Sequence, residues 1–231
     1  MSRLNRVVTF LLWSFPFIVG AQHLDELKSS ALNGNEEAQV SLALAYFTGG
    51  QIEANVDSAI HYFKMAAESG SSSAQLNLAI IYHQGIEVPR NIPEAEKWYI
   101  MAAYQDVAEA QYSLGMLYFG EDCSNISCGN AVKWLLLAAE QDHRDAQNQL
   151  GNIYLNGDGI TIDYQKALKW YRIAAKAGHS DAQYNLGWMY FYGRGVTKNN
   201  SVATMWLKMS ADEGNMKASD FIRSNRLERY F

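Results

Sequence analysis

The sequence is poor in proline, the strongest breaker of helices. It contains only 3 prolines in 231 residues, while alanine and long apolar residues are spread evenly along the chain. With 48% hydrophobic residues, the composition is that of an ordinary folded protein and not of a disordered tail. Because these residue types favour helix over strand, the composition predicts an all-α fold.

The sequence also lacks the short motifs that mark common catalytic sites. It has no Gly-x-Ser-x-Gly, no Ser-x-x-Lys, no His-Glu-x-x-His and no phosphate-binding loop. Its histidines are interpreted as surface residues at unrelated positions. They are His23, His61, His83, His143 and His179. No catalytic residue, metal site or cofactor is therefore predicted, and the chain is not expected to be an enzyme.

Basic clusters are missing as well. Residues 1–21 hold two arginines and no acid, so the remainder carries 17 basic against 24 acidic residues. Binding to a phosphate backbone requires clustered Lys and Arg, and the sequence has no such run. Nucleic acid is therefore excluded as a partner, whereas a protein or peptide with apolar and basic residues fits the charge.

The N-terminal residues 1–21 have the three parts of a secretory signal peptide. Arg3 and Arg6 precede a 13-residue apolar core, and small residues follow before Gln22. A membrane anchor is the alternative, but the apolar core is shorter than the roughly 20 residues needed to cross a bilayer. We expect an exported chain, periplasmic or secreted, that begins near Gln22 and has no stable membrane insertion.

An Ala-Gln pair recurs every 36 residues. Counted from its alanine as position 0, position 4 is leucine, position 5 is alanine or glycine, and position 8 is tyrosine in every copy. Positions 0, 4, 5 and 8 share one face of a helix, so the pattern predicts a helix A in each repeat. The five pairs are Ala38-Gln39, Ala74-Gln75, Ala110-Gln111, Ala146-Gln147 and Ala182-Gln183.

A second helical pattern, helix B, follows glycines near positions 10 and 11 in each repeat. Position 21 is always alanine, position 24 is Tyr or Trp, and positions 28 and 29 are Ala-Ala in four repeats. Large aromatic residues opposite small ones predict helices that stack into one continuous core. The predicted single domain, 22–231, comprises a cap helix at 24–33, repeats at 38–73, 74–109, 110–145, 146–181 and 182–217, and a cap helix at 218–231.

The motif Ala-Gln-x-x-Leu-Gly-x-x-Tyr at residues 182–190, continued by Gly-Arg-Gly at 193–195, resembles the Sel-one-like repeat family, whose members are related to tetratricopeptide repeats. The resemblance covers about residues 24–231. It implies a right-handed superhelical α-solenoid of about five 36-residue repeats with helix A on the concave side. It also implies a role in protein-protein contact, without naming a partner.

Positions 2, 6 and 9 of helix A lie away from the packing face and are mostly apolar or aromatic. We therefore predict a partner-binding groove. Its residues are Tyr112, Met116, Phe119, Asn148, Asn152, Tyr184, Trp188 and Phe191. The residue before four of the five repeats is acidic and predicts an acidic rim made of Glu37, Glu109, Asp145 and Asp181. Burial of this face against neighbouring helices A is the alternative interpretation.

The only cysteines, Cys123 and Cys128, lie in the loop between helices A and B of the third repeat. In an exported protein this spacing favours a local disulfide. A zinc site would need two further ligands, and a redox pair is normally Cys-x-x-Cys.

The predicted function is an exported adaptor or scaffold that binds a peptide or protein surface in its concave groove. The alternative is an envelope hydrolase or β-lactam-binding protein, because cysteine-rich members of the resembled family have been associated with β-lactams. Those members carry a cysteine pair in each repeat, whereas this chain has one pair. The sequence does not indicate an oligomeric state.

Overall fold

The computed structural model describes residues 21–49, 52–120 and 125–230, and these residues are helical apart from turns and short connections. The prediction of an all-α chain of tandem helix pairs is confirmed. The helices fall into two compact units, residues up to 110 and residues from 111 onward, and each unit is described by itself. The predicted signal peptide lies in residues outside the described ranges, except for Ala21.

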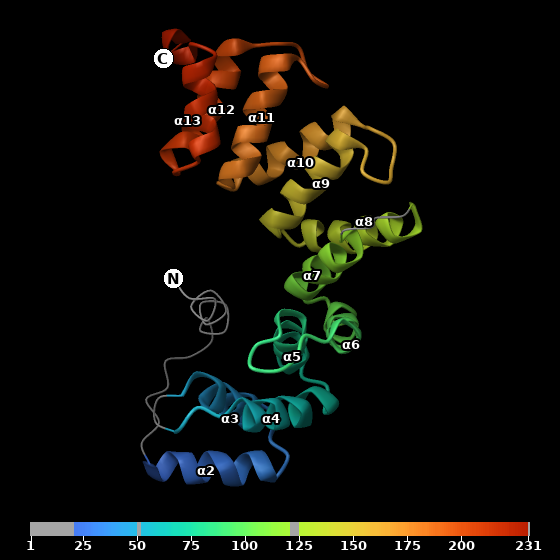
Figure 1. Ribbon diagram of the computed structural model, residues 1–231, viewed down its shortest axis with the longest axis vertical. Coiled ribbons are helices and arrows are strands. Elements are labelled where there is room, and N and C mark those ends of the chain that lie inside the picture. The colour runs from blue at the N-terminus through green and yellow to red at the C-terminus, as the bar shows by residue number, and fades with distance from the viewer. Residues whose placement is uncertain (1–20, 50–51, 121–124, 231) are drawn as a thin grey trace. The chain divides into compact units, whose positions relative to one another are not determined.

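In the N-terminal unit, a lone helix precedes two helix pairs (Figure 1). Sequential helices pack against each other, as helical hairpins do. The elements are α2 (Ala21–Leu32), α3 (Glu36–Thr48), α4 (Val56–Glu68), α5 (Ser72–Gln84) and α6 (Ile92–Ala103). Helices α3 and α5 are helices A, and α4 and α6 are helices B.

The C-terminal unit continues the alternation. The boundary between the units falls in the first turn of α7. The elements are α7 (Ala108–Phe119), α8 (Asn125–Glu140), α9 (Arg144–Asn156), α10 (Tyr164–Lys176), α11 (Ser180–Tyr192), α12 (Asn200–Asp212), α13 (Met216–Ser224) and the 3-10 turn η2 (Leu227–Tyr230). Helices α7, α9, α11 and α13 are helices A, and α8, α10 and α12 are helices B.

Side-chain caps start most of the helices. The N-cap oxygen or nitrogen accepts a hydrogen bond from a backbone N–H of the first turn, which otherwise has no partner within the helix. The caps are Asn35, Asn55, Ser71, Asn91, His143, Asp163, His179, Asn199 and Asn215. His143 and His179 hold the same place in consecutive repeats, so the expectation that the histidines stand at unrelated positions is wrong for this pair.

The core consists of the small and apolar residues that repeat every 36 positions. Leu150 and Ala167 are fully buried, as are their counterparts in the neighbouring repeats. Gly151 is required where α9 meets α10, because a Cβ at that position would collide with the ring of Tyr171. Helices A and B therefore pack at close range, as the small residue at position 5 predicts.

The aromatic residues at position 24 of helix B divide into two groups. Trp98 and Trp170 are 3% and 7% exposed, whereas Trp134, Trp206 and Tyr62 are half-buried. Core packing is therefore complete for two of the five. Tyr62 and Trp206 still pack against the core, with part of each side chain exposed.

In four of the five Ala-Gln pairs, the glutamine joins consecutive repeats. Its side chain is buried, and its Nε2 donates to the carbonyl oxygen of an alanine near the end of the preceding helix B. These contacts explain why the pair recurs: the alanine packs and the glutamine satisfies a helix C-terminal carbonyl. The bonds run from Gln39 to Ala31, Gln75 to Ala67, Gln147 to Ala139 and Gln183 to Ala175, at 3.0 to 3.2 Å.

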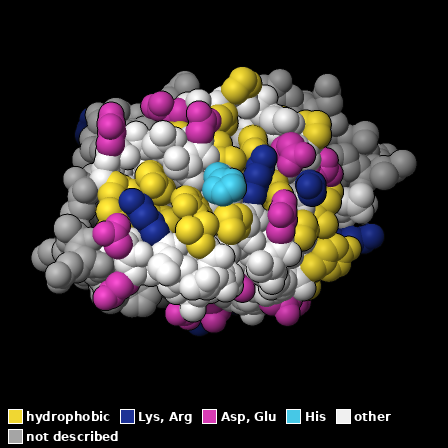
Figure 2. Space-filling model, turned by 90° about the horizontal axis from the view of Figure 1, so that it is seen from below, with side chains coloured by type: hydrophobic (Ala, Val, Ile, Leu, Met, Phe, Trp, Pro, Cys, Tyr) yellow, Lys and Arg dark blue, Asp and Glu magenta, His cyan; other side chains and the backbone are white. Residues whose placement is uncertain are grey.

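The ends of the array are closed differently. Helix α2 covers Ala38 and Leu42 with Leu24 and Leu27, and Figure 2 shows that hydrophobic side chains remain in the middle of the face at this end, with Asp and Glu around them. At the other end, the turn η2 buries Leu227 against α12 and α13. No helix among the described residues is long and apolar enough to span a membrane.

Cys128 is fully buried in α8, near the start of the helix and not in the loop where the sequence analysis placed it, and Cys123 lies outside the described residues. The Cys123–Cys128 pairing therefore stays a prediction.

Candidate functional site

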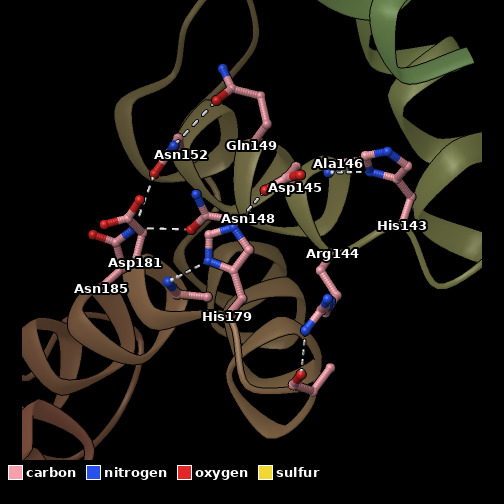
Figure 3. A network of polar contacts seen from close by, with 12 residues as sticks. His143, Arg144, Asp145, Ala146, Asn148, Gln149, Asn152, His179, Asp181 and Asn185 are labelled. Atoms are coloured by element: carbon pink, nitrogen blue, oxygen red, sulfur yellow. Dashed lines mark hydrogen bonds and ion pairs between the residues drawn. The ribbon is translucent and has the colours of Figure 1, made fainter. Parts of the chain in front are cut away.

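Three asparagines form a connected cluster on one face of α9 and α11, the face that carries positions 2, 3 and 6 of helix A and is called the inner face below. The Nδ2 of Asn185 donates to the Oδ1 of Asn148 at 3.1 Å and to the Oδ1 of Asn152 at 3.3 Å (Figure 3). All three side chains are half-buried. Asn148 and Asn152 belong to the predicted groove, and the structure joins them to Asn185, which the sequence analysis did not include.

Tyr171 of α10 fixes the base of this cluster. Its hydroxyl donates to the Oδ1 of Asn152 at 2.7 Å, and its side chain is fully buried. Burial raises the pKa of Tyr171, with a smaller contribution from Asp158, so the hydroxyl remains a donor at neutral pH. The Nδ2 of Asn152 in turn donates to Gln149 at 3.3 Å.

Two amide atoms of the asparagine cluster are left without a partner within the part of the chain that the structure describes, and they indicate which ligand the cluster can bind. Among the described residues, the Nδ2 of Asn148 and the Oδ1 of Asn185 have no hydrogen-bond partner. One is a donor and the other an acceptor, and they belong to side chains already joined by a hydrogen bond. A donor and an acceptor held side by side match the N–H and C=O of an extended peptide backbone.

An aromatic cluster adjoins the asparagines on α11 and α13. Phe221 lies edge-on to Tyr184, Phe191 and Tyr192, with ring centroids 5.2 to 6.2 Å apart, and Trp188 lies 4.8 Å from Tyr192. Tyr184, Trp188, Phe191 and Phe221 are half-buried and Tyr192 is 50% exposed. Burial, then the neighbouring Tyr192, raises the pKa of Tyr184.

The predicted groove residues of α7 pack more locally. The ring of Tyr112 stacks on His143 at 4.6 Å. Met116 and Phe119 lie partly buried against the core of the same unit. Each of the eight predicted groove residues is thus half-buried, so neither a fully open trough nor complete burial describes this face.

Two acidic residues of the predicted rim, Asp145 and Asp181, have partners within the fold. The Oδ1 of Asp145 lies 2.9 Å from the Nε2 of His179, and the Oδ1 of Asp181 accepts from the Nδ2 of Asn215 at 2.9 Å. His179 and Asn215 are the N-caps of the following helices A, so each acid also braces the next repeat. Both acids remain exposed, as does Glu37, whereas Glu109 is half-buried.

The hydrogen bond from His179 lowers the pKa of Asp145, and burial opposes this shift to a smaller extent. A surface pocket of about 230 Å³ lies beside this pair and is lined by Arg144, Asp145, His179 and Ser180. The pair is not arranged for general base catalysis, because the Nδ1 of His179 accepts from the Ala182 N–H at 3.2 Å. Both ring nitrogens are therefore engaged.

Sequence reasoning identified most of this surface but not its organisation. Tyr184, Trp188 and Phe191 do lie together, and Asn148 and Asn152 adjoin them through Asn185. The residues that it missed are Gln149, Asn185, Tyr192 and Phe221. Gln149 and Asn185 occupy position 3 of helix A, which is polar in all five repeats, so this periodicity could have identified them. Phe221 occupies the same position in the C-terminal cap helix, where the polar pattern ends.

Comparison with known proteins places these features in a family. A model of the Sel1 repeat matches residues 36–71, 72–107, 108–143, 144–179 and 180–215. No curated protein matches the chain.

Solved structures give the same result. A protective antigen of uropathogenic Escherichia coli displaying an SLR fold is 35% identical with a TM-score of 0.79, over 84% of this chain and 42% of that one. A Sel1 repeat protein from Oxalobacter formigenes is 31% identical with a TM-score of 0.75, over 85% and 78% of the two chains. This chain therefore spans less than half of the Escherichia coli protein.

Proposed function

The chain belongs to the Sel1 repeat family, and from this premise we propose that it is an exported adaptor that binds an extended peptide segment along the inner face of α9, α11 and α13. Sel1 repeat proteins are in general protein-interaction modules. The inner-face site is a proposal of its own and rests on the geometry of the C-terminal unit.

The single observation that carries the proposal is the adjacency of unpaired amides and half-exposed aromatic rings. Asn148 and Asn185 offer a donor and an acceptor to a peptide backbone, and Trp188 and Tyr192 offer an apolar surface to its side chains. Backbone bonding supplies affinity without sequence preference, while an aromatic anchor supplies selectivity. A surface with only one of these features would be less suited to a peptide.

Charge sets the expected composition of the partner. Asp145 and Asp181 lie at the start of α9 and α11 and are exposed, so they favour basic residues at that end of the peptide. Because they lie at the edge of the surface, they should mainly raise the association rate.

Selection from a random peptide library against the purified chain tests the proposal. The affinity of a selected peptide would be measured by calorimetry for the wild type and for Asn148→Ala/Asn185→Ala. We expect the double variant to bind at least tenfold more weakly. Asn130→Ala, an exposed asparagine on α8, is the matched control and should bind normally.

Unchanged affinity of the double variant, with loss in the Asn130 variant, would place the site on the helix B side and refute the proposal. The hydrolase alternative gains no support from the described residues, since the one His–Asp pair that lines a pocket has no free imidazole nitrogen. A nitrocefin assay of the purified chain checks it directly, and we expect no turnover.

A further inference from the structure

Helix α10 carries an exposed row of cations on its outer side. Lys166, Lys169, Arg172 and Lys176 are all exposed, and the helix contains no acidic residue. Their spacing of three, three and four residues places them on one side of the helix. This row corrects the expectation that basic clusters are missing, because its members are spaced apart in the sequence and gather only on the surface of the helix.

Few of these charges are used within the fold. Lys166 lies 3.4 Å from Asp163, an ion pair with its lysine 57% exposed. Arg172 donates to the hydroxyl of Tyr190 at 3.2 Å, and Lys169 lies over the ring of Trp170 at 4.9 Å. Neither of these contacts neutralises a charge, so most of the positive charge is directed at solvent.

Exposed apolar residues flank this row. Helix α9 packs against both α8 and α10, and α11 against both α10 and α12, so the three helices B form the outer layer of the C-terminal unit. At the positions equivalent to Lys169 and Ile173 of α10, α8 has Lys133 and Leu137, and α12 has Met205 and Met209. Leu137, Met205 and Met209 are 43%, 50% and 42% exposed.

We propose that this outer face, Lys166, Lys169, Arg172 and Lys176 with Leu137, Met205 and Met209 beside them, docks on the surface of an anionic lipid bilayer. Cations interspersed with Leu and Met suit the boundary between headgroups and acyl chains, where the charges meet anionic lipid and the apolar side chains enter. We choose an anionic bilayer as the partner because its charge is complementary to that of the cations on α10. The inner face stays free for the peptide.

The net negative charge of the chain does not oppose such docking. Asp145 lies beside the C-terminal end of α10, because it contacts His179 and its neighbour Arg144 donates to the carbonyl oxygen of Ala177. It therefore reduces the attraction near Lys176 alone. Glu140 and Asp212 lie near the ends of α8 and α12 and reduce the attraction there. Lys166, Lys169 and Arg172 lie in earlier turns of α10 than Lys176, so they are farther from these acids.

Co-sedimentation with vesicles tests the proposal. The full chain would be mixed with phosphatidylglycerol/phosphatidylcholine vesicles and with phosphatidylcholine vesicles, at low and at physiological salt. We expect binding to the anionic vesicles alone, weakened by salt. Lys169→Gln/Arg172→Gln/Lys176→Gln should lower partitioning more than tenfold, because each basic residue near an anionic surface contributes about fivefold.

The matched control is Lys97→Gln/Lys198→Gln/Lys217→Gln, which removes the same charge from exposed sites elsewhere. It should bind anionic vesicles within about twofold of the wild type, and the apolar N-terminal segment is common to all three proteins. Equal loss in both triple variants, or equal binding of the wild type to neutral vesicles, would overturn the proposal. Binding to an acidic polypeptide such as polyglutamate with no binding to either vesicle would overturn it as well.

Discussion

Gln105 donates its side-chain Nε2 to the Oε1 of Gln75 at 2.8 Å and to the carbonyl oxygen of Gly70 at 3.0 Å. Gln141 repeats the contact with Gln111, also at 2.8 Å. In the other repeats, the position of Gln105 and Gln141 is occupied by Ser69, Ala177 and Glu213. There the Oε1 atoms of Gln39, Gln147 and Gln183 are buried without a partner. We call the hydrogen bond that joins Gln105 to Gln75, and Gln141 to Gln111, the glutamine clamp. Within the described residues it is formed in two places and missing in three.

Ala177→Gln should complete one of these clamps. The new amide would donate to the Oε1 of Gln147, and a buried acceptor that gains a donor contributes about 0.5 to 1.5 kcal/mol. We expect the free energy of unfolding in urea to rise by about this amount. Lys176→Gln, the exposed neighbour, is the control and should change little. A destabilised Ala177→Gln variant would show that a glutamine at this position does not form the bond that Gln105 forms in its own repeat.

Trp170→Ala should be the most damaging of the tryptophan substitutions in the C-terminal unit. The side chain is 7% exposed, and truncating a buried large aromatic residue costs about 3 to 5 kcal/mol. Trp206→Ala, at the equivalent but half-buried position, should cost less than half as much. Urea unfolding followed by circular dichroism compares them, and equal losses would contradict the burial pattern.

Asp145 should stabilise the fold only above acidic pH. Its pKa is lowered in the folded state, so its contribution is present above about pH 4, its unfolded value, and is lost as pH falls through the lower folded pKa. Because the carboxylate is 63% exposed, the contribution should not exceed about 1 kcal/mol. Thermal melts of the wild type and Asp145→Asn should differ at pH 7 and converge below pH 4. A constant difference would assign the effect to something other than the charge.

Mass spectrometry of a non-reduced digest decides the pairing of the cysteines. We expect a peptide that joins Cys123 to Cys128 in protein recovered from its native compartment. Reduction should cost less than the ~3 kcal/mol of a 15-residue loop, because the closed ring is small. Two free thiols would contradict both the pairing and the inferred export.

The repeat and its core were predictable because they depend on spacing. A 36-residue period with invariant Leu, Ala and Gly positions fixes the two helices and the faces that pack, since no single repeat can bury that face alone. The glutamine contacts between repeats were not predicted. Gln39 and its equivalents look like ordinary polar helix residues, and only the structure shows that their amides reach back to the preceding helix.

The candidate site was less predictable because it depends on side-chain partners. A helical wheel places Asn148, Asn152 and Trp188 on one side, but it cannot show that Asn185 bridges the first two. The acids illustrate the same limit. Asp145 and Asp181 were predicted from charge alone to form a rim, whereas the structure pairs them with His179 and Asn215.

Amide chemical-shift mapping of the chain with a selected peptide is the most direct test of the central claim, that the inner face of α9, α11 and α13 binds a protein segment. The account predicts that the largest changes fall on the side chains of Asn148, Asn185 and Trp188, and that Trp188→Ala weakens binding by at least ~2 kcal/mol while the melting temperature stays nearly constant. Changes confined to α8, α10 and α12, with normal affinity of Trp188→Ala, would contradict it.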